Sequence, residues 1–282
     1  MTRKLFILIA ACWTLLMPCQ ATQYTQKDSI KVMTLLAKAA RQKPSTNWMI
    51  FFARELKGVP YVGKTLEVNS EEQLIVNLRE LDCTTYVENV ISLSLCMKTG
   101  KRSFQDYCTF LRQIRYRQGE VGYPTRLHYF TQWIADNTEM GFVSEIQKPN
   151  PPFTATQLLD IDFMSTHQSY YPMLTDHPQW TALIRAEEQK LTGREYQYIP
   201  KEEIRNSSLF RQTILDGDII AITTKKKGLD TSHIGIAVWH KDGLHMLNAS
   251  QVRKKVVEEP MTLYQYMQKH PSQQGIRIIR VK

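Results

Sequence analysis

The N-terminal half of the chain carries apolar residues at helical spacing. Residues 28–42 and 46–57 repeat apolar positions every three or four residues, so each segment predicts an amphipathic helix. The second helix is expected to end at the Gly-Val-Pro triplet of residues 58–60, because proline cannot continue a helix. A third helix is predicted from Thr84, with one apolar face made of Val87, Val90, Ile91 and Leu95.

The last third of the chain changes to alternating apolar and polar positions. Successive strands are predicted at Ile219–Thr223, His233–Trp239 and Leu244–Asn248. The intervening residues 100–215 have a mixed pattern that is mostly helical. Helices followed by antiparallel strands predict an α+β fold.

The connection between the last two strands decides which of their residues face each other. A two-residue Asp-Gly turn would place Asn248 opposite Ala237, too far along the strand from His233. A four-residue loop at 240–243 places Asn248 opposite Gly235 instead, diagonal to His233 on the same face. We predict the longer loop.

Residues 1–21 have the composition of an export signal. A basic start leads into an apolar stretch that ends in Cys-Gln-Ala, which predicts cleavage after Ala21. Lipidation at Cys12, within a lipobox-like Ile-Ala-Ala-Cys sequence, or at Cys19 is an alternative. The apolar run is shorter than the ~20 residues that span a bilayer. We expect residues 22–282 to form a single catalytic domain with a helical N-terminal segment.

The chain is moderately basic. Its formal net charge is +9, and removal of residues 1–21 takes away Arg3 and Lys4 and no acid, which leaves +7. Lysine and arginine are spread along the sequence, which contains no helix-turn-helix, zinc-finger or RNA-binding signature. For an exported protein this charge favours an anionic partner such as carboxylate-rich cell wall.

Three cysteines follow the signal segment: Cys83, Cys96 and Cys108. An odd number leaves at least one thiol unpaired in an oxidising compartment. They form no C-x-x-C pair, and the seven histidines are scattered without metal-ligand spacing, so no structural metal site is expected. Cys96 and Cys108 lie among apolar or aromatic residues and are expected to be buried core thiols.

Cys83 lies where the third helix is expected to begin. Asp82 is one candidate N-cap, and the sequence Thr85-x-x-Glu88 is an alternative capping box. Either cap puts Cys83 at or just before the first turn, where the partial positive charge of the helix favours a nucleophilic thiolate. The competing interpretation is a small buried side chain without chemistry.

His233 and Asn248 complete a candidate catalytic set. His233 begins a strand, on the face opposite its apolar residues, and follows Cys83 in the order typical of papain-type enzymes. Its imidazole can take a thiol proton, and Asn248 on the hairpin partner can orient the ring. Each residue alone has a structural explanation, but together they are the three parts of a thiol nucleophile.

Several sequence blocks together resemble one known family. The blocks are "GVPYVGKTLE", "NLRELDCTTYVENV", "YPTRLHYFTQWIADN", "YIPKEEI", "GDIIAITTKKKGLDTSHIGIAV" and "LNAS". They are similar to the N-acetylmuramoyl-L-alanine amidase-like branch of the NlpC superfamily of papain-like cell-wall hydrolases. The resemblance implies a papain-like α+β fold, in which the helix bearing the nucleophile packs on an antiparallel sheet, with helical N-terminal and middle additions.

The resemblance also implies roles for single residues. Cys83 is the nucleophile and His233 the base, and the third position, often histidine in relatives, is Asn248 here. Tyr61 matches a tyrosine that relatives place beside the nucleophile, near the oxyanion or the substrate.

Four further residues are assigned to substrate binding or the oxyanion. Arg126 and His128 are expected to line the cleft, where the Arg126 guanidinium can grip a carboxylate of the peptide stem. Asp82 and Ser232 adjoin the nucleophile and the base.

The expected function is that of an exported, periplasmic cysteine amidase. It would hydrolyse the amide between N-acetylmuramic acid and L-alanine in peptidoglycan or muropeptides, without a metal or organic cofactor. Membrane association is expected only if the chain is lipidated, and nucleic acid is not an expected partner. A γ-D-glutamyl-diamino acid endopeptidase and a catalytically silent cell-wall-binding protein are the alternatives, and the oligomeric state is open.

Overall fold

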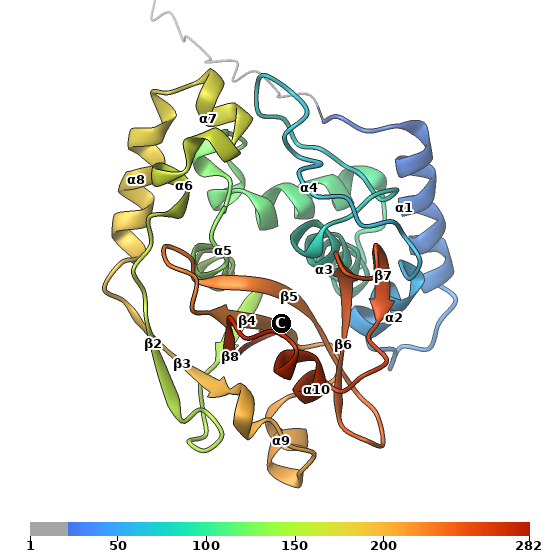
Figure 1. Ribbon diagram of the computed structural model, residues 1–282. Helices are drawn as coiled ribbons and strands as arrows, with labels where there is room; N and C mark the ends of the chain where they lie inside the picture. Colours follow the sequence, from blue (N-terminus) through green and yellow to red (C-terminus); the bar gives the residue numbers. More distant parts are fainter. Residues whose placement is uncertain (1–21) are drawn as a thin grey trace, which may run out of the picture.

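The computed structural model describes residues 22–282 as a mixed α/β fold with one antiparallel sheet and several helices (Figure 1). The predicted signal segment, with Cys12 and Cys19, lies outside the described residues.

The described helices are α1 (Gln26–Ala39), α2 (Trp48–Glu55), α3 (Cys83–Thr99), α4 (Phe104–Arg115), α5 (Phe130–Glu139), α6 (Phe163–Thr166), α7 (Pro172–Asp176), α8 (Trp180–Leu191), α9 (Ser208–Thr213) and α10 (Leu263–Gln268). Short 3-10 turns occur at Arg117–Gly119, Tyr123–Thr125, Gln168–Tyr170 and Lys201–Glu203. The strands are β1 (Val143–Ile146), β2 (Ala155–Leu158), β3 (Glu195–Pro200), β4 (Ile219–Thr224), β5 (Thr231–Trp239), β6 (Leu244–Ser250), β7 (Lys255–Glu258) and β8 (Gln273–Val281).

The sheet is built around the C-terminal strand. Its order is β2-β3-β8-β4-β5-β6-β7, β1 also pairs with β8, and all of these pairs are antiparallel. Strands β4, β5 and β6 follow one another in sequence and in space, which is the usual result of short hairpin connections.

Helix α3 forms the centre of the larger core. Every residue from Thr85 to Met97 is buried, and the helix packs on β5 and β6 through a cluster that includes Ile234 and Ile236 (Figure 1). The opposite face of the sheet, with Ala237 and Met246, is covered by α9 and α10. Successive residues of β5 point to opposite faces of the sheet. Its apolar residues therefore point toward α3, and His233 points toward the opposite face.

A reciprocal cap fixes the start of α3. The Asp82 carboxylate accepts a hydrogen bond from the Thr85 N–H at 2.8 Å, and the Thr85 hydroxyl accepts one from the Asp82 N–H at 2.9 Å. The alternative Thr85–Glu88 box is wrong, because Glu88 is buried and accepts a hydrogen bond from Arg115. Cys83 is thus the first helical residue.

The predicted helices and strands are confirmed, with one exception. Residues 28–42, 46–57 and the segment from Thr84 correspond to α1, α2 and α3, and the three predicted strands correspond to β4, β5 and β6. The mostly helical prediction for residues 100–215 is incomplete, because β1, β2 and β3 also lie there. Each of these strands has only one buried residue, so their sequences lack the apolar alternation that marks a strand.

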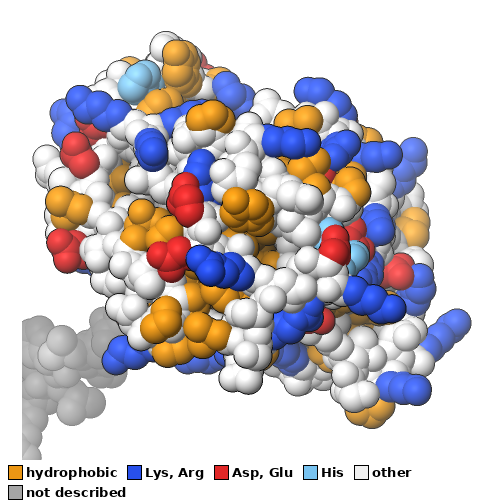
Figure 2. Space-filling model, turned by 60° about the horizontal axis from the view of Figure 1, so that its bottom comes forward, with side chains coloured by type: hydrophobic (Ala, Val, Ile, Leu, Met, Phe, Trp, Pro, Cys, Tyr) orange, Lys and Arg blue, Asp and Glu red, His pale blue; other side chains and the backbone are white. Residues whose placement is uncertain are grey.

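The surface agrees with the spread of charge along the sequence. Figure 2 shows Lys and Arg side chains scattered over one face of the molecule, with Asp and Glu side chains between them. Among residues 22–282, none of the helices has the length and apolar character needed to cross a bilayer.

Candidate active site

Cys83 projects from the N-terminal end of α3 and is half-buried. Hydrogen bonding from the Ile234 backbone, next to His233 in β5, and from the backbone and side chain of Thr84 acts to lower the pKa of the thiol. The start of the helix and the start of the strand therefore meet at the thiol. Cys96 and Cys108 are fully or nearly fully buried, as expected for core thiols.

His233 is held by the predicted partner. Its Nε2 lies 3.0 Å from Asn248 Oδ1, and Asn248 is fully buried on β6. The Asn248 oxygen can only accept, so His233 Nε2 donates and Nδ1 is the nitrogen that can take a proton.

The strand register confirms the four-residue loop. Strand β5 ends at Trp239, opposite Leu244, and Ile236 pairs with Leu247. One step further along this register places Asn248 opposite Gly235, diagonal to His233.

Cys83 and His233 line one pocket, of about 200 Å³, together with the exposed Ser232 and the half-buried His128. Apolar and aromatic side chains, among them Tyr171, form much of the remaining wall. An elongated molecule in this pocket can therefore meet the thiol while its apolar parts leave water.

Both candidate reacting groups are neutral in the free protein. Burial, and after it the Asp82 carboxylate, raises the pKa of Cys83 to about 12. Burial lowers the pKa of His233, which the Asn248 hydrogen bond partly offsets. Burial thus outweighs the effect of the helix start, and the pair rests as thiol and imidazole rather than as thiolate and imidazolium.

Tyr61 lies close to the thiol. Its strand-like segment bridges to Leu81, two residues before Cys83. Burial, followed by the charges of Cys83 and Asp82, raises the pKa of Tyr61 to about 12, so its hydroxyl keeps its proton and can donate. Asp82 itself serves as the N-cap of α3.

A buried carboxylate fixes the start of β5. Asp230 accepts hydrogen bonds from the Thr131 N–H in the first turn of α5, at 2.6 Å, and from the Thr231 N–H, at 2.7 Å. Helix α5 has no side-chain cap at Tyr129, so Asp230 supplies one from a distant part of the chain. This ties the strand that carries His233 to the helical layer.

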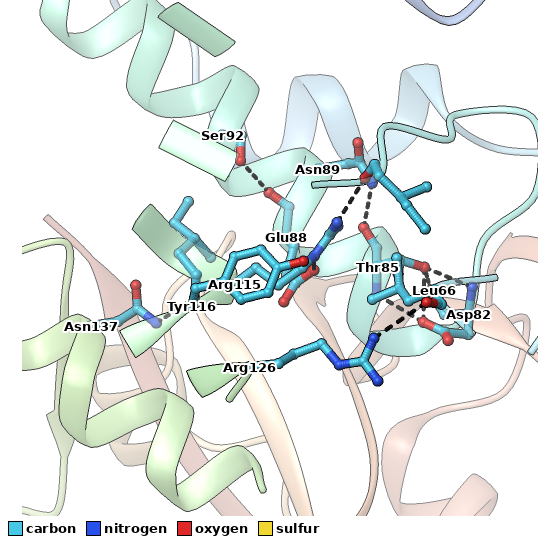
Figure 3. Close-up of polar contacts among 12 residues, drawn as sticks. Leu66, Asp82, Thr85, Glu88, Asn89, Ser92, Arg115, Tyr116, Arg126 and Asn137 are labelled. Atoms are coloured by element: carbon cyan, nitrogen blue, oxygen red, sulfur yellow. Dashed lines mark hydrogen bonds and ion pairs between the residues drawn. The ribbon is translucent and has the colours of Figure 1, made fainter. Parts of the chain in front are cut away.

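Arg126 does not have the free guanidinium that the sequence suggested. It is buried, forms ion pairs with Glu67 and with Glu72 (3.3 Å), and lies 4.7 Å from the centre of the Tyr123 ring. Figure 3 shows its guanidinium directed at the Leu66 carbonyl. Because two carboxylates already hold this cation, it would have to exchange them to grip a substrate carboxylate, and that role stays a prediction.

His128 lies between two pockets. It lines the pocket with Cys83 and a second one, also of about 200 Å³, that contains Asp82 and Arg126. Burial, with Arg126 as the second cause, lowers the pKa of His128 to about 3, so the ring is neutral. Its Nε2 donates to the Tyr123 carbonyl at 2.8 Å, which leaves Nδ1 as an acceptor.

A further ion pair lies behind the helix start. Arg115 donates to Glu88 at 2.8 Å and to the Ile75 carbonyl at 2.7 Å, and both charged side chains are buried (Figure 3). This pair joins α3 to α4 and to the loop before Cys83.

Comparison with known proteins identifies the family of the chain. The family model described as AmiA-like, N-acetylmuramoyl-L-alanine amidase-like, matches residues 51–276. The chain belongs to this amidase-like family.

Solved structures show the same relationship. An N-acetylmuramoyl-L-alanine amidase from Bacteroides uniformis is 36% identical, with a TM-score of 0.78 over 83% of this chain and 98% of that one. A putative xylanase from Bacteroides fragilis is also 36% identical, with a TM-score of 0.76 over 82% and 99% of the two chains. Protein LPG0564 of Legionella pneumophila, at 22% identity and a TM-score of 0.70 over 90% and 94%, shares the fold. No curated protein matches the chain.

Three residues in or beside the pocket of this amidase-like protein were not found from the sequence. Thr84 forms a hydrogen bond with the thiol, Tyr171 lines the pocket, and the Tyr266 ring of α10 lies 6.4 Å from the His233 ring. Of the three, only Thr84 could have been found from the sequence, because it directly follows the candidate nucleophile Cys83. Tyr171 lies just before α7 and Tyr266 lies within α10, and the positions of these short helices depend on tertiary packing.

Proposed function

We propose that the protein is an exported cysteine amidase that cleaves the bond between N-acetylmuramic acid and L-alanine in peptidoglycan or muropeptides. The observation that carries this proposal is the hydrogen bond that joins Asn248 to His233, which lines the same pocket as Cys83. Membership of the amidase-like family and the 36% identical Bacteroides amidase support the choice of bond.

The first half of the reaction forms a thioester. The Cys83 sulfur attacks the lactyl carbonyl carbon while its proton passes to His233 Nδ1, so the charged pair forms only during attack. Asn248 accepts from Nε2 and stabilises the imidazolium. His233 then gives this proton to the L-alanine nitrogen as the C–N bond breaks, and the stem peptide leaves.

The oxyanion of the tetrahedral intermediate needs donors near the sulfur. The Cys83 N–H is one, because the first N–H of a helix has no acceptor one turn earlier. The Tyr61 hydroxyl is the second candidate. Water, deprotonated by His233, then attacks the thioester and releases the muramic acid carboxylate and the free thiol.

The same proposal extends to fold lineage and location. A cysteine on a helix start, with a histidine and an asparagine on a neighbouring hairpin, fits a papain-like enzyme of the NlpC superfamily, with residues 22–282 as one catalytic domain. The composition of residues 1–21 supports export to the periplasm.

Mass spectrometry of digested muropeptides tests the bond. A disaccharide-tetrapeptide should give a peptide-free sugar and an intact stem peptide that begins with L-alanine. Cleavage of an L-Ala-γ-D-Glu-diaminopimelate tripeptide after glutamate, with the muramoyl peptide left intact, would instead indicate the endopeptidase. If neither substrate is cut but both bind, the protein is a wall-binding relative.

A further inference from the structure

The loop between β5 and β6 brings two histidines and an aspartate together. Ligand atoms of His240, Asp242 and His245 all lie within 4.8 Å of one another, and the two imidazole rings stack with centres 4.2 Å apart. The spacing of histidines in the sequence gave no indication of this, because a hairpin rather than a helix creates the contact. The loop is at the opposite end of the hairpin from His233 and Asn248.

Hydrogen bonds fix the tautomer of His245. This side chain is 3% exposed, and its Nδ1 lies 2.9 Å from the Glu259 carbonyl oxygen, which can only accept. Nδ1 therefore carries the proton, and in the neutral ring Nε2 presents a lone pair. Nε2 lies 3.0 Å from Asp242 Oδ1, so either a proton or a metal ion lies between these two atoms.

His240 is oriented in a comparable way. Its Nε2 lies 2.8 Å from Glu258 Oε1, which makes Nε2 the donor and leaves Nδ1 with a lone pair. A metal-binding histidine commonly donates its other N–H to a carboxylate or a backbone carbonyl, and the two imidazoles have one partner of each kind.

We propose that His240, Asp242 and His245 bind a divalent transition metal ion, with Zn²⁺ as the best fit. Two imidazole nitrogens and one carboxylate oxygen form a borderline-soft ligand set, which suits Zn²⁺ better than Mg²⁺ or Ca²⁺. The 3.0 Å between His245 Nε2 and Asp242 Oδ1 is close to the roughly 3.3 Å that separates ligands of a tetrahedral ion with bonds of about 2.0 Å.

Charged residues around the proposed metal site indicate which side chains bind the ion and which only orient them. Arg54 and Lys57 pair with Glu258, at 3.0 and 3.4 Å, so this carboxylate orients His240 and is not itself a ligand. Asp242 is 64% exposed and free to close on the ion. The site is far along the hairpin from the thiol, so a bound ion would act by holding the hairpin closed and not by entering the reaction.

Metal titration of the tag-free protein tests this assignment. A Cys83→Ala background removes the pocket thiol as a competing ligand. After chelation and desalting, Co²⁺ should bind at one equivalent with visible absorption, and Zn²⁺ should displace it and raise Tm. In that background, Asp242→Asn, His240→Gln and His245→Asn should each weaken Zn²⁺ at least about 10-fold. His167→Gln, which changes an exposed imidazole elsewhere, should leave the affinity unchanged.

Imidazole NMR separates the metal site from a simple ion pair. Zn²⁺ should shift the Nε2 signal of His245, while the Nδ1 proton stays hydrogen-bonded to the Glu259 carbonyl. A His245 ring whose signals do not respond to Zn²⁺ would overturn the proposal. The same conclusion follows if Asp242→Asn, which lies on an exposed loop and should fold, binds Zn²⁺ as tightly as its parent.

Discussion

Removal of the Asn248 side chain is the most informative change in the candidate site. Asn248→Ala deletes the 3.0 Å hydrogen bond between the fully buried Asn248 side chain and His233 Nε2. In the transition state this bond is made to an imidazolium, and hydrogen bonds to charged groups contribute about 1.5–3 kcal/mol. The expected loss in kcat/KM is therefore about 10- to 150-fold, with activity remaining.

The pH profile gives a second signature of the same change. Burial lowers the pKa of His233, and the Asn248 hydrogen bond opposes that shift because it favours the charged ring. Without the bond the pKa falls further. Because the neutral imidazole is the base, the acidic limb of kcat/KM should move to lower pH in Asn248→Ala.

Hydrolysis of a muropeptide, followed by chromatography across the pH range, measures both effects. Asn137→Ala is the matched control, because Asn137 is also fully buried but donates to the Ile114 and Trp133 carbonyls instead. It should lower Tm without moving the acidic limb. Asn248→His, which introduces the residue common in relatives, should restore part of the rate. Wild-type kcat/KM and an unmoved limb in Asn248→Ala would refute the orienting role.

Three other experiments test residues in and around the candidate active site. Arg115→Met leaves Glu88 buried and unpaired, so the free energy of unfolding measured with urea should fall by about 3–5 kcal/mol. Most of this loss should be recovered when Glu88→Gln is added, and a loss below about 1 kcal/mol would contradict the prediction. Alkylation of Cys83 should accelerate steadily from about pH 6 to about pH 9, because burial raises its pKa to about 12; a pH-independent rate would indicate a preformed thiolate. Gly235→Ala places a Cβ 2.4 Å from Met246 Cγ, so Tm and kcat/KM should both fall, and an unchanged Tm would show that the hairpin adjusts freely.

The features predicted correctly from the sequence are those with local causes. Helix α3 follows from its apolar spacing, and the Asp82 cap, one of the two caps that the sequence offered, starts it at Cys83. The partner of His233 could be predicted because the hairpin loop length alone determines the register that brings Asn248 near.

The features that escaped prediction depend on distant parts of the chain. Arg126 meets Glu67 and Glu72 from a loop without periodicity, so its engagement in ion pairs had no sequence signal. Burial of Cys83, which reverses the expected thiolate, arises only when β5 closes over the helix start. The approach of His240 to His245 likewise depends on the hairpin.

Cys83→Ala, incubated with a disaccharide-tetrapeptide and followed by mass spectrometry, tests the central claim most directly. The parent protein should release a peptide-free sugar and a stem peptide with a free L-alanine amine. The variant should keep the parent Tm within a few degrees and release neither product, because no other group in the pocket replaces the sulfur nucleophile. Release of both products at the parent rate by the purified variant would contradict a cysteine mechanism at this site.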